Sequence, residues 1–473
     1  MNSISRFIKN IFYTFFANGF SLLISTISML FLPKILNVRG YGFWQLYVLY
    51  TSYLGIFHLG LCDGIYIKYG GRSYKDLNKK LFSQQLEILF FFVVFSALLL
   101  MLVLFNINDI DIDKREIILC TIIASILYIP KTYLLMAMQA LGDFKAFSRT
   151  TIYERFAFGA IMLIFLYFRL DNFIYYVYAD LFGRFIVLIY SLRIFQHYLS
   201  IKNGISKIAI KECIKDICTG FPILLSGLAS NLIIGLIRFF IEDKWSIVDF
   251  SKISLSLSML NLFLSFVNMV GLVLFPILKN TENESLQKIF KLSDKMSVFL
   301  LLFSLALGAP IVVFIHFWLP NYADSIQQFC VLLPCCIIEC KMSMVCISYF
   351  KSLYMQKELL YVNILTVVCS GFLSWIVVYK LQNLDLIAYL ILLLLLFRMI
   401  ISENLIRKKL AIKNELMTLY IIIVIVNYLV LYNIFDIYIT SFISLIVLII
   451  LLIKERKFFL CNIKSLKSFN DSN

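Results

Sequence analysis

Charged residues are scarce in this chain of 473 residues. Asp, Glu, Lys and Arg make up 15% of it, where a soluble domain has about a quarter. This shortage, with 61% hydrophobic residues and a mean hydropathy of +0.90, excludes a soluble enzyme, a disordered chain and a nucleic-acid-binding domain. It indicates an all-α polytopic membrane protein. The formal net charge of +15 then reflects topology, because Lys and Arg gather in cytoplasmic loops.

The sequence lacks the residues that a metal site, an ATPase site or an acid–base active site would require. The chain has three His, and none lies among the five Cys of segment 330–346, so no metal site is expected and these Cys should pack between helices. No P-loop motif occurs, which excludes ATP hydrolysis of that kind. The outer loops are mostly under about fifteen residues and hold no compact acid–base site, so we expect neither an enzyme nor a cofactor. No cleavable signal peptide is expected, since the first apolar run is long enough to span.

Long apolar runs predict about fourteen transmembrane helices of about 20 residues each. They are expected at residues 10–32, 43–66, 84–105, 116–139, 147–168, 173–195, 220–241, 253–277, 296–318, 325–350, 359–379, 384–404, 415–433 and 437–453. With both termini taken as cytoplasmic, 31 of the 43 basic residues, Arg155 and Arg398 among them, fall in cytoplasmic segments, and 9, Arg238 among them, fall on the opposite side. This bias predicts a multi-pass protein with both termini in the cytoplasm.

The helices are expected to form two similar units of six. The predicted domains are an N-terminal six-helix bundle at 1–200, an amphipathic linker with a second six-helix bundle at 201–410, and two extra helices with a cytoplasmic tail at 411–473. An even number of helices in each unit makes the repeat parallel. The linker, about 201–219, places four Lys among apolar residues and is predicted to lie on the cytoplasmic surface.

Charged residues inside the predicted spans are candidates for function, because a charge at membrane depth usually faces protein or a wet cavity. They are Asp63, Lys131, Asp180, Arg184, Glu339 and Lys341. Asp180 and Arg184 lie four residues apart and are expected to pair. Lys131 and Lys341 have no partner at helical spacing, so they are expected to be available to a ligand. The alternatives are a structural pair for Arg184 and snorkelling for Lys131.

Glu339 and Asp63 can also be interpreted as residues with a structural role. Glu339 lies two residues from Lys341, about 200° around the helix, so these side chains should each find another partner. Asp63 lies near the end of its span beside Lys68, and a surface salt bridge between the two is the structural interpretation.

Polar residues form a single stripe on the first predicted helix. The stripe consists of Thr14, Asn18, Ser21, Ser25 and Ser28, at spacings of four and three residues. It predicts that Asn18, Ser21 and Ser25 line a cavity between the two bundles, with close packing through small residues as the alternative. The seventh helix has a shorter stripe that includes Asn231 and Arg238.

Residues 32–71 carry a series of short motifs. They read Leu32-Pro33-Lys34-Ile35-Leu36, Tyr41-Gly42-Phe43-Trp44-Gln45-Leu46, Leu59-Gly60-Leu61-Cys62-Asp63-Gly64-Ile65-Tyr66 and Lys68-Tyr69-Gly70-Gly71, and are followed by Gln139-Ala140-Leu141-Gly142-Asp143-Phe144-Lys145 and Leu319-Pro320-Asn321-Tyr322. This pattern resembles the Wzx-type polysaccharide flippases of bacteria, in the polysaccharide transporter family of the multidrug/oligosaccharidyl-lipid/polysaccharide (MOP) superfamily. The family often has an acid beside the basic residue late in helix 7, and here only Arg238 is present.

The resemblance implies a MATE/MOP-like fold, with two six-helix bundles in a V around a central cavity, two C-terminal helices, and alternating access. The implied substrate is an oligosaccharide repeat unit on undecaprenyl diphosphate. It would be moved from the cytoplasmic to the outer leaflet of the bacterial cytoplasmic (inner) membrane for O-antigen or capsule synthesis. The implied partners are membrane lipid, a polysaccharide polymerase and chain-length proteins.

The candidate residues suit this chemistry. Buried cations supply charge-assisted hydrogen bonds to a diphosphate, so Lys131, Arg184, Lys341 and Arg238 are the candidate substrate-binding residues, with Asn231 lining the cavity. The carboxylates at membrane depth, Asp63, Asp180 and Glu339, are candidate carriers of a coupled H⁺ or Na⁺. The alternatives are a drug/cation antiporter or lipid II flippase of the same superfamily, or a membrane glycosyltransferase or polymerase.

Overall fold

The computed structural model describes residues 3–107, 109–199, 205–279, 283–412 and 417–454. Every regular element in these ranges is a helix. Ten helices are long and apolar enough to cross a membrane, or up to twelve when each of two bent pairs counts as one span. The predicted all-α class is confirmed, and the chain is a multi-pass membrane protein.

The contacts between residues divide the chain into two compact units. Unit 1 is Met1–Met269 with Leu359–Leu384, and unit 2 is Val270–Glu358 with Asp385–Asn473. These groupings differ from the ranges 1–200, 201–410 and 411–473, which stay a prediction, as does the V-shaped arrangement of two bundles.

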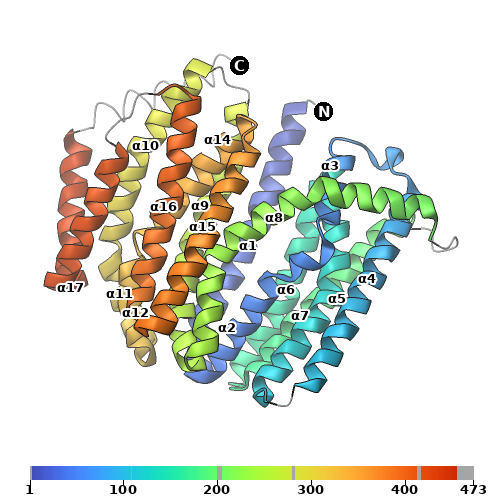
Figure 1. Ribbon diagram of the computed structural model, residues 1–473, viewed down its shortest axis with the longest axis horizontal. Helices are drawn as coiled ribbons and strands as arrows, with labels where there is room; N and C mark the ends of the chain where they lie inside the picture. Colours follow the sequence, from blue (N-terminus) through green and yellow to red (C-terminus); the bar gives the residue numbers. More distant parts are fainter. Residues whose placement is uncertain (1–2, 108, 200–204, 280–282, 413–416, 455–473) are drawn as a thin grey trace. The chain divides into compact units, whose positions relative to one another are not determined.

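Unit 1 is a bundle of long helices (Figure 1). They are α1 (Ser3–Ile35), α2 (Val38–Ser52), α3 (Leu61–Tyr69), α4 (Lys79–Asn106), α5 (Ile112–Ala140), α6 (Phe144–Tyr167), α7 (Phe173–Phe195), α8 (Lys207–Lys244), most of α9 (Ile247–Lys279) and most of α15 (Gln356–Trp375). Side chains at their starts satisfy free backbone N–H groups. Asn37 accepts a hydrogen bond from Gly40 N at the start of α2, and Asp143 accepts one from Ala146 N at the start of α6.

The predicted span 43–66 is a broken helix. It consists of α2, the short helix η1 (Leu54–His58) and α3, and its two parts are bent by 61°. Leu59 and Gly60 at the break have φ of 50° and 90°, a region that favours glycine. The bend turns α3 toward α8.

Residues 207–219 of the predicted linker and the seventh span form one helix, α8; residues 201–204 of the linker lie outside the described residues. Ser206 caps the start of α8, and Pro222 lies inside it. Figure 1 shows the first part of α8 running across the ends of α4 and α5 before the helix turns. The helix lies very close to α3: a Cβ on Gly64 or Gly220 would collide with backbone of the other helix, so glycine is needed at both positions.

Unit 2 contains shorter and more interrupted helices. They are α10 (Asn283–Ala306), α11 (Gly308–Trp318), α12 (Ala323–Leu332), α13 (Cys335–Cys340), the π-helix η4 (Lys341–Cys346), α14 (Ile347–Ser352), α16 (Leu386–Lys409) and α17 (Met417–Lys454). The chain bends by 55° between Leu332 and Cys335, beside Pro334. The two predicted spans at 415–433 and 437–453 correspond to α17, which is divided by non-helical Asp436 and forms two adjacent halves (Figure 1).

Candidate functional site

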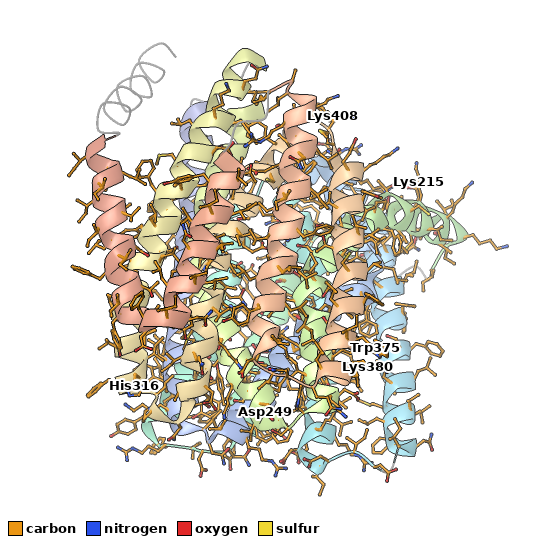
Figure 2. The ribbon with its side chains drawn as sticks, turned by 60° about the vertical axis from the view of Figure 1, so that its left-hand side comes forward. Lys215, Asp249, His316, Trp375, Lys380 and Lys408 are labelled. Atoms are coloured by element: carbon orange, nitrogen blue, oxygen red, sulfur yellow. The ribbon has the colours of Figure 1, made fainter. Side chains whose placement is uncertain are left out.

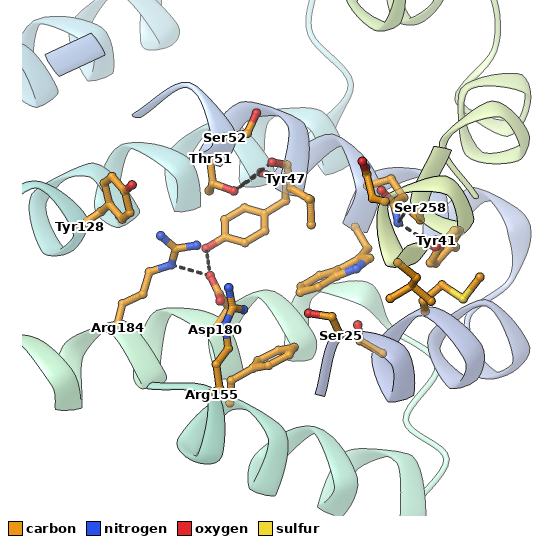
Figure 3. Close-up of a pocket in the computed structure, with 18 residues that line it drawn as sticks. Ser25, Tyr41, Tyr47, Thr51, Ser52, Tyr128, Arg155, Asp180, Arg184 and Ser258 are labelled. Carbon is orange, nitrogen blue, oxygen red and sulfur yellow. Dashed lines mark hydrogen bonds and ion pairs between the residues drawn. The ribbon is translucent and has the colours of Figure 1, made fainter. Parts of the chain in front are cut away.

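A cavity of about 390 Å³ lies within unit 1. Figure 3 shows side chains from helices packed around it. Its polar lining consists of Ser25, Ser28, Tyr41, Gln45, Tyr47, Thr51, Ser52, Tyr128, Arg155, Asp180, Arg184, Ser258 and Asn261. These residues come from α1, α2, α5, α6, α7 and α9, so segments far apart in the sequence build one pocket.

Among the described residues of the lining, Asp180 is the one carboxylate. Its Oδ2 accepts hydrogen bonds from the Tyr47 hydroxyl at 2.7 Å and from Arg184 Nε at 2.6 Å (Figure 3). The predicted pairing of Asp180 with Arg184 is therefore confirmed. Arg184 uses only Nε for this bond, and its terminal guanidinium nitrogens make no hydrogen bond to any residue that the structure describes. The pair orients Arg184 and leaves those nitrogens for a ligand.

Arg155 is the second cation of the pocket. It lies near the middle of α6 and makes no ion pair within the described ranges. The charge count along the sequence placed it in a connecting segment, whereas the structure places it inside α6. The signal that could have identified it was present, because the predicted span 147–168 already contained this arginine.

Lys131 lies behind the pocket rather than in its lining. Its Nζ donates to both carboxylate oxygens of Glu154 at 2.9 Å, and the Tyr128 ring centroid lies 4.8 Å from Nζ. The expectation that Lys131 is available is wrong, and so is the snorkelling alternative, since its side chain is only 6% exposed. Sequence reasoning missed Glu154, which comes from the next helix along the chain.

The charges around the pocket do not cancel. Lys131 and Glu154 neutralise one another, which leaves the guanidinium groups of Arg155 and Arg184 against the carboxylate of Asp180. A low-dielectric wall strengthens the field of such an excess charge. The pocket is therefore suited to an anionic group.

The polar stripe of α1 contributes in part. Ser25 and Ser28 line the pocket, whereas Asn18 and Ser21 are half-buried and lie outside its lining. Ser21 donates its hydroxyl to Ala17 O, 3.0 Å away, within its own helix. Whether these residues face a cavity between two bundles stays a prediction.

Arg238 and Asn231 lie on α8. Arg238 Nη2 donates to Gln45 O at 3.3 Å and Ser254 Oγ at 3.1 Å, and no carboxylate of the described residues pairs with it. Arg238 was counted among loop residues, and this assignment is corrected, because it lies inside α8. The side chain of Asn231 is exposed, and its backbone oxygen accepts from the Tyr53 hydroxyl.

Asp63 lies half-buried on α3 and forms no ion pair with any described residue. The suggested salt bridge with Lys68 is absent from the described part of the chain. Lys68 instead donates to Glu212 at 2.9 Å and to Asp216 at 2.7 Å on α8. Asp63 stays a candidate ion carrier by prediction alone.

The remaining candidates belong to unit 2. Lys341 lies between Asp294, 2.9 Å from its Nζ, and Glu403, with which it also pairs. Arg407 donates to the second oxygen of Asp294 at 2.6 Å, and all four side chains are at most 4% exposed. We call these four residues the Lys341 cluster. Its two cations match its two carboxylates, so the expectation that Lys341 is available is wrong.

Glu339 also has a partner from another helix. Its Oε1 pairs with Arg398 Nη1 at 3.2 Å, so Glu339 and Lys341 do find separate partners, as expected. Arg398 was counted as a cytoplasmic residue, but it is 3% exposed inside α16. Within the described ranges, no three His, Cys, Asp or Glu side chains come together in a way that could hold a metal ion.

No family model and no curated protein sequence matches the chain. Solved structures do match. The lipid II flippase MurJ, in an inward closed conformation, aligns with a TM-score of 0.68 at 12% identity, over 96% of this chain and 100% of that one. An inward-facing multidrug resistance MATE family transporter of the MOP superfamily aligns with a TM-score of 0.63 at 13% identity, over 83% and 98%.

The chain has the fold of the MOP-superfamily transporters. A third match is a MOP superfamily transporter from Pyrococcus furiosus, for which a reverse polarity of the binding pocket suggests a different function. It aligns with a TM-score of 0.51 at 14% identity, over 85% of this chain and 96% of that one. Within the MOP fold function is decided by the site rather than by the architecture.

Proposed function

We propose that the protein is a flippase for an oligosaccharide repeat unit carried on undecaprenyl diphosphate. It moves this lipid from the cytoplasmic to the outer leaflet of the cytoplasmic membrane for surface polysaccharide (O-antigen or capsule) synthesis. The observation that carries the proposal is the excess positive charge of the unit 1 pocket, where Arg155 and Arg184 outnumber Asp180. The MOP fold supports a transporter rather than an enzyme.

The geometry of Arg184 suits a diphosphate. Guanidinium groups donate two parallel hydrogen bonds to phosphate oxygens, and the terminal nitrogens of Arg184 are not used by the described residues. Asp180 and Tyr47 hold the side chain in place before the ligand arrives, which lowers the entropy lost on binding. Polar side chains such as Ser25 and Asn261 supply partners for sugar hydroxyls.

The size of the cavity supports a headgroup site. A volume of about 390 Å³ lies at the lower end of the range for small-ligand pockets. It accommodates a diphosphate with its first sugar, while the polyprenyl chain remains in the lipid. Alternating access then exposes this site to each leaflet in turn.

The drug/cation antiporter is less well supported, because a cationic drug favours a net acidic pocket and this one is basic. A lipid II flippase stays a specific alternative, since the MurJ structure aligns over 96% of the chain and its substrate class presents the same diphosphate chemistry. The coupling ion is H⁺ or Na⁺ in this proposal. Asp180 is the best-placed carrier, because its release from Arg184 would change the charge that the ligand meets.

The experiment measures surface polysaccharide in a host whose own flippase gene is deleted. Arg155→Gln and Arg184→Gln should each lower export about 10- to 100-fold, which corresponds to the loss of one charged hydrogen-bonding group at roughly 1.5–3 kcal/mol. Lys in place of either arginine should retain more activity than Gln. Arg193→Gln is the matched control, because Arg193 is an exposed residue of the same helix as Arg184.

Membrane levels of each variant must equal those of the wild type, so that loss of export reports binding rather than folding. Lipid-linked repeat units should accumulate on the cytoplasmic side in the inactive variants. Wild-type export by both Gln variants would overturn the proposal. Rescue of a strain depleted of its lipid II flippase, without polysaccharide export, would favour the alternative substrate.

A further inference from the structure

The helix α8 is longer than the hydrocarbon core of a membrane is thick. The helix has 38 residues and is about 57 Å long at 1.5 Å per residue, whereas the hydrocarbon core is about 30 Å thick. Pro222 lies between the part that crosses the bundle end and the rest. We call residues 207–219 the arm. Figure 1 shows the arm crossing the ends of α4 and α5.

Two contacts with α4 place the arm at the edge of the apolar surface of unit 1. Ser206 Oγ, at the start of the arm, donates to Gln84 Oε1 at 2.9 Å, and Gln85 Nε2 donates to Asp216 Oδ2 at 2.7 Å. Large exposed apolar side chains on α4 begin at Phe90, about 8 Å farther along the helix at 1.5 Å per residue. The arm therefore lies beside the end of the exposed apolar surface of α4.

The arm has three distinct faces. At 100° per residue, its packed face holds the buried residues Ala209, Cys213 and Asp216. The basic face lies roughly opposite, with Lys207, Lys211 and Lys215 within about 80° of one another; all three are exposed.

An apolar flank lies between these two faces. It carries Ile210 and Ile214, which are 45% and 57% exposed. An amphipathic helix with lysines beside an exposed apolar strip is the pattern of a helix that lies in the interface plane of a membrane.

The acidic residues of the arm do not offset its lysines. Glu212 and Asp216 both pair with Lys68 of α3, at 2.9 and 2.7 Å. The arm together with Lys68 therefore carries four positive charges against two negative ones, and this excess lies on the basic face. Figure 2 shows Lys215 on the outer surface of the arm.

We propose that the arm is a binding surface for anionic phospholipid headgroups of the membrane in which the protein lies. The apolar flank enters the boundary of the acyl chains, and the three lysines contact headgroup phosphates. Continuity with the lipid-facing surface of α4, where Phe91 is 61% and Phe95 is 62% exposed, favours lipid over a protein partner. This inference does not depend on the transported substrate.

The test measures hydrogen exchange of the arm in the full-length protein, reconstituted into nanodiscs of phosphatidylcholine with increasing phosphatidylglycerol. Exchange of peptides from residues 207–219 should slow as phosphatidylglycerol is added, and the effect should weaken at high salt because charges at a surface are screened. Each lysine near an anionic surface contributes about fivefold in affinity. The triple variant Lys207→Gln, Lys211→Gln, Lys215→Gln should therefore lose about 100-fold in affinity and show little slowing at phosphatidylglycerol contents that slow the wild type.

Two controls separate binding from folding and from net charge. The triple Arg variant at the same positions should respond as the wild type does. The variant Lys145→Gln, Lys408→Gln, Lys409→Gln loses the same charge at exposed positions and should keep the response of the arm. Equal exchange of the wild-type arm with and without phosphatidylglycerol, or an unchanged response in the triple Gln variant, would overturn the proposal.

Discussion

Removal of Lys341 should destabilise unit 2 rather than only block transport. In the variant Lys341→Met, Asp294 keeps Arg407 as a partner, whereas the partner that Glu403 keeps among the described residues is the Thr418 hydroxyl, which donates to it at 2.7 Å. A buried carboxylate is then left without a counter-charge, which costs about 3–5 kcal/mol. For an unfolding unit of about 150–250 residues, this loss lowers Tm by roughly 6–20 °C.

A second substitution should reverse the effect. Glu403→Gln in the Lys341→Met background removes the uncompensated charge, while the amide keeps a hydrogen-bonding partner for Thr418 and the Asp294–Arg407 pair remains. Thermal unfolding of the purified protein should then return to within a few degrees of the wild type, as one buried charge pair has been replaced by neutral groups. Lys408→Met is the control, because Lys408 is exposed on α16.

Surface polysaccharide export by the double variant shows whether Lys341 only stabilises unit 2 or also binds substrate. Recovery of both stability and surface polysaccharide would assign Lys341 to the architecture of unit 2. Recovery of stability without export would support the role predicted from the sequence, in which Lys341 binds substrate. A Tm for Lys341→Met equal to that of the wild type would refute the electrostatic reasoning.

Three further predictions concern unit 1 and the topology. Glu154→Gln should lower Tm by leaving Lys131 buried and unpaired, and the added change Lys131→Met should restore it; a stable single variant would contradict the pairing. Gly220→Ala should reduce folded protein, at a cost of about 1–3 kcal/mol or more, whereas Gly227→Ala on the same helix meets open space and should not; equal yields would contradict the close contact with α3. In a chain without native Cys, external thiol labelling should reach positions 110 and 436 but not 76 or 408, and labelling at 408 would overturn the topology.

The helical class and the approximate helix positions follow from the sequence, because a membrane-crossing helix must be an apolar run of about 20 residues. Each predicted span corresponds to a helical region of the structure. The pairing of Asp180 with Arg184 was also predictable, because residues four apart share one face of a helix. The amphipathic pattern at 201–219 predicted a helix on the cytoplasmic surface; residues 207–219 are helical in the structure, and their place at that surface stays a prediction.

The ion-pair partners of Lys131 and Lys341 could not be predicted from local spacing in the sequence. Glu154 lies 23 residues from Lys131, and Glu403 lies 62 residues from Lys341, so no local spacing signals either pair. The charge count also treated Arg155 and Arg398 as loop residues, although both lie inside the predicted spans 147–168 and 384–404. Only helix packing brings these groups together.

The sequence by itself therefore determined that this protein spans a membrane many times, because burying apolar side chains in lipid depends on composition and local periodicity. The tertiary structure alone decided which cations are free to meet a ligand. Lys131 and Lys341 are neutralised by carboxylates from other helices, while Arg155 and Arg184 face a pocket that holds one carboxylate. Charge balance at a site is a sum over neighbours in space, and neighbours in space come from distant parts of the chain.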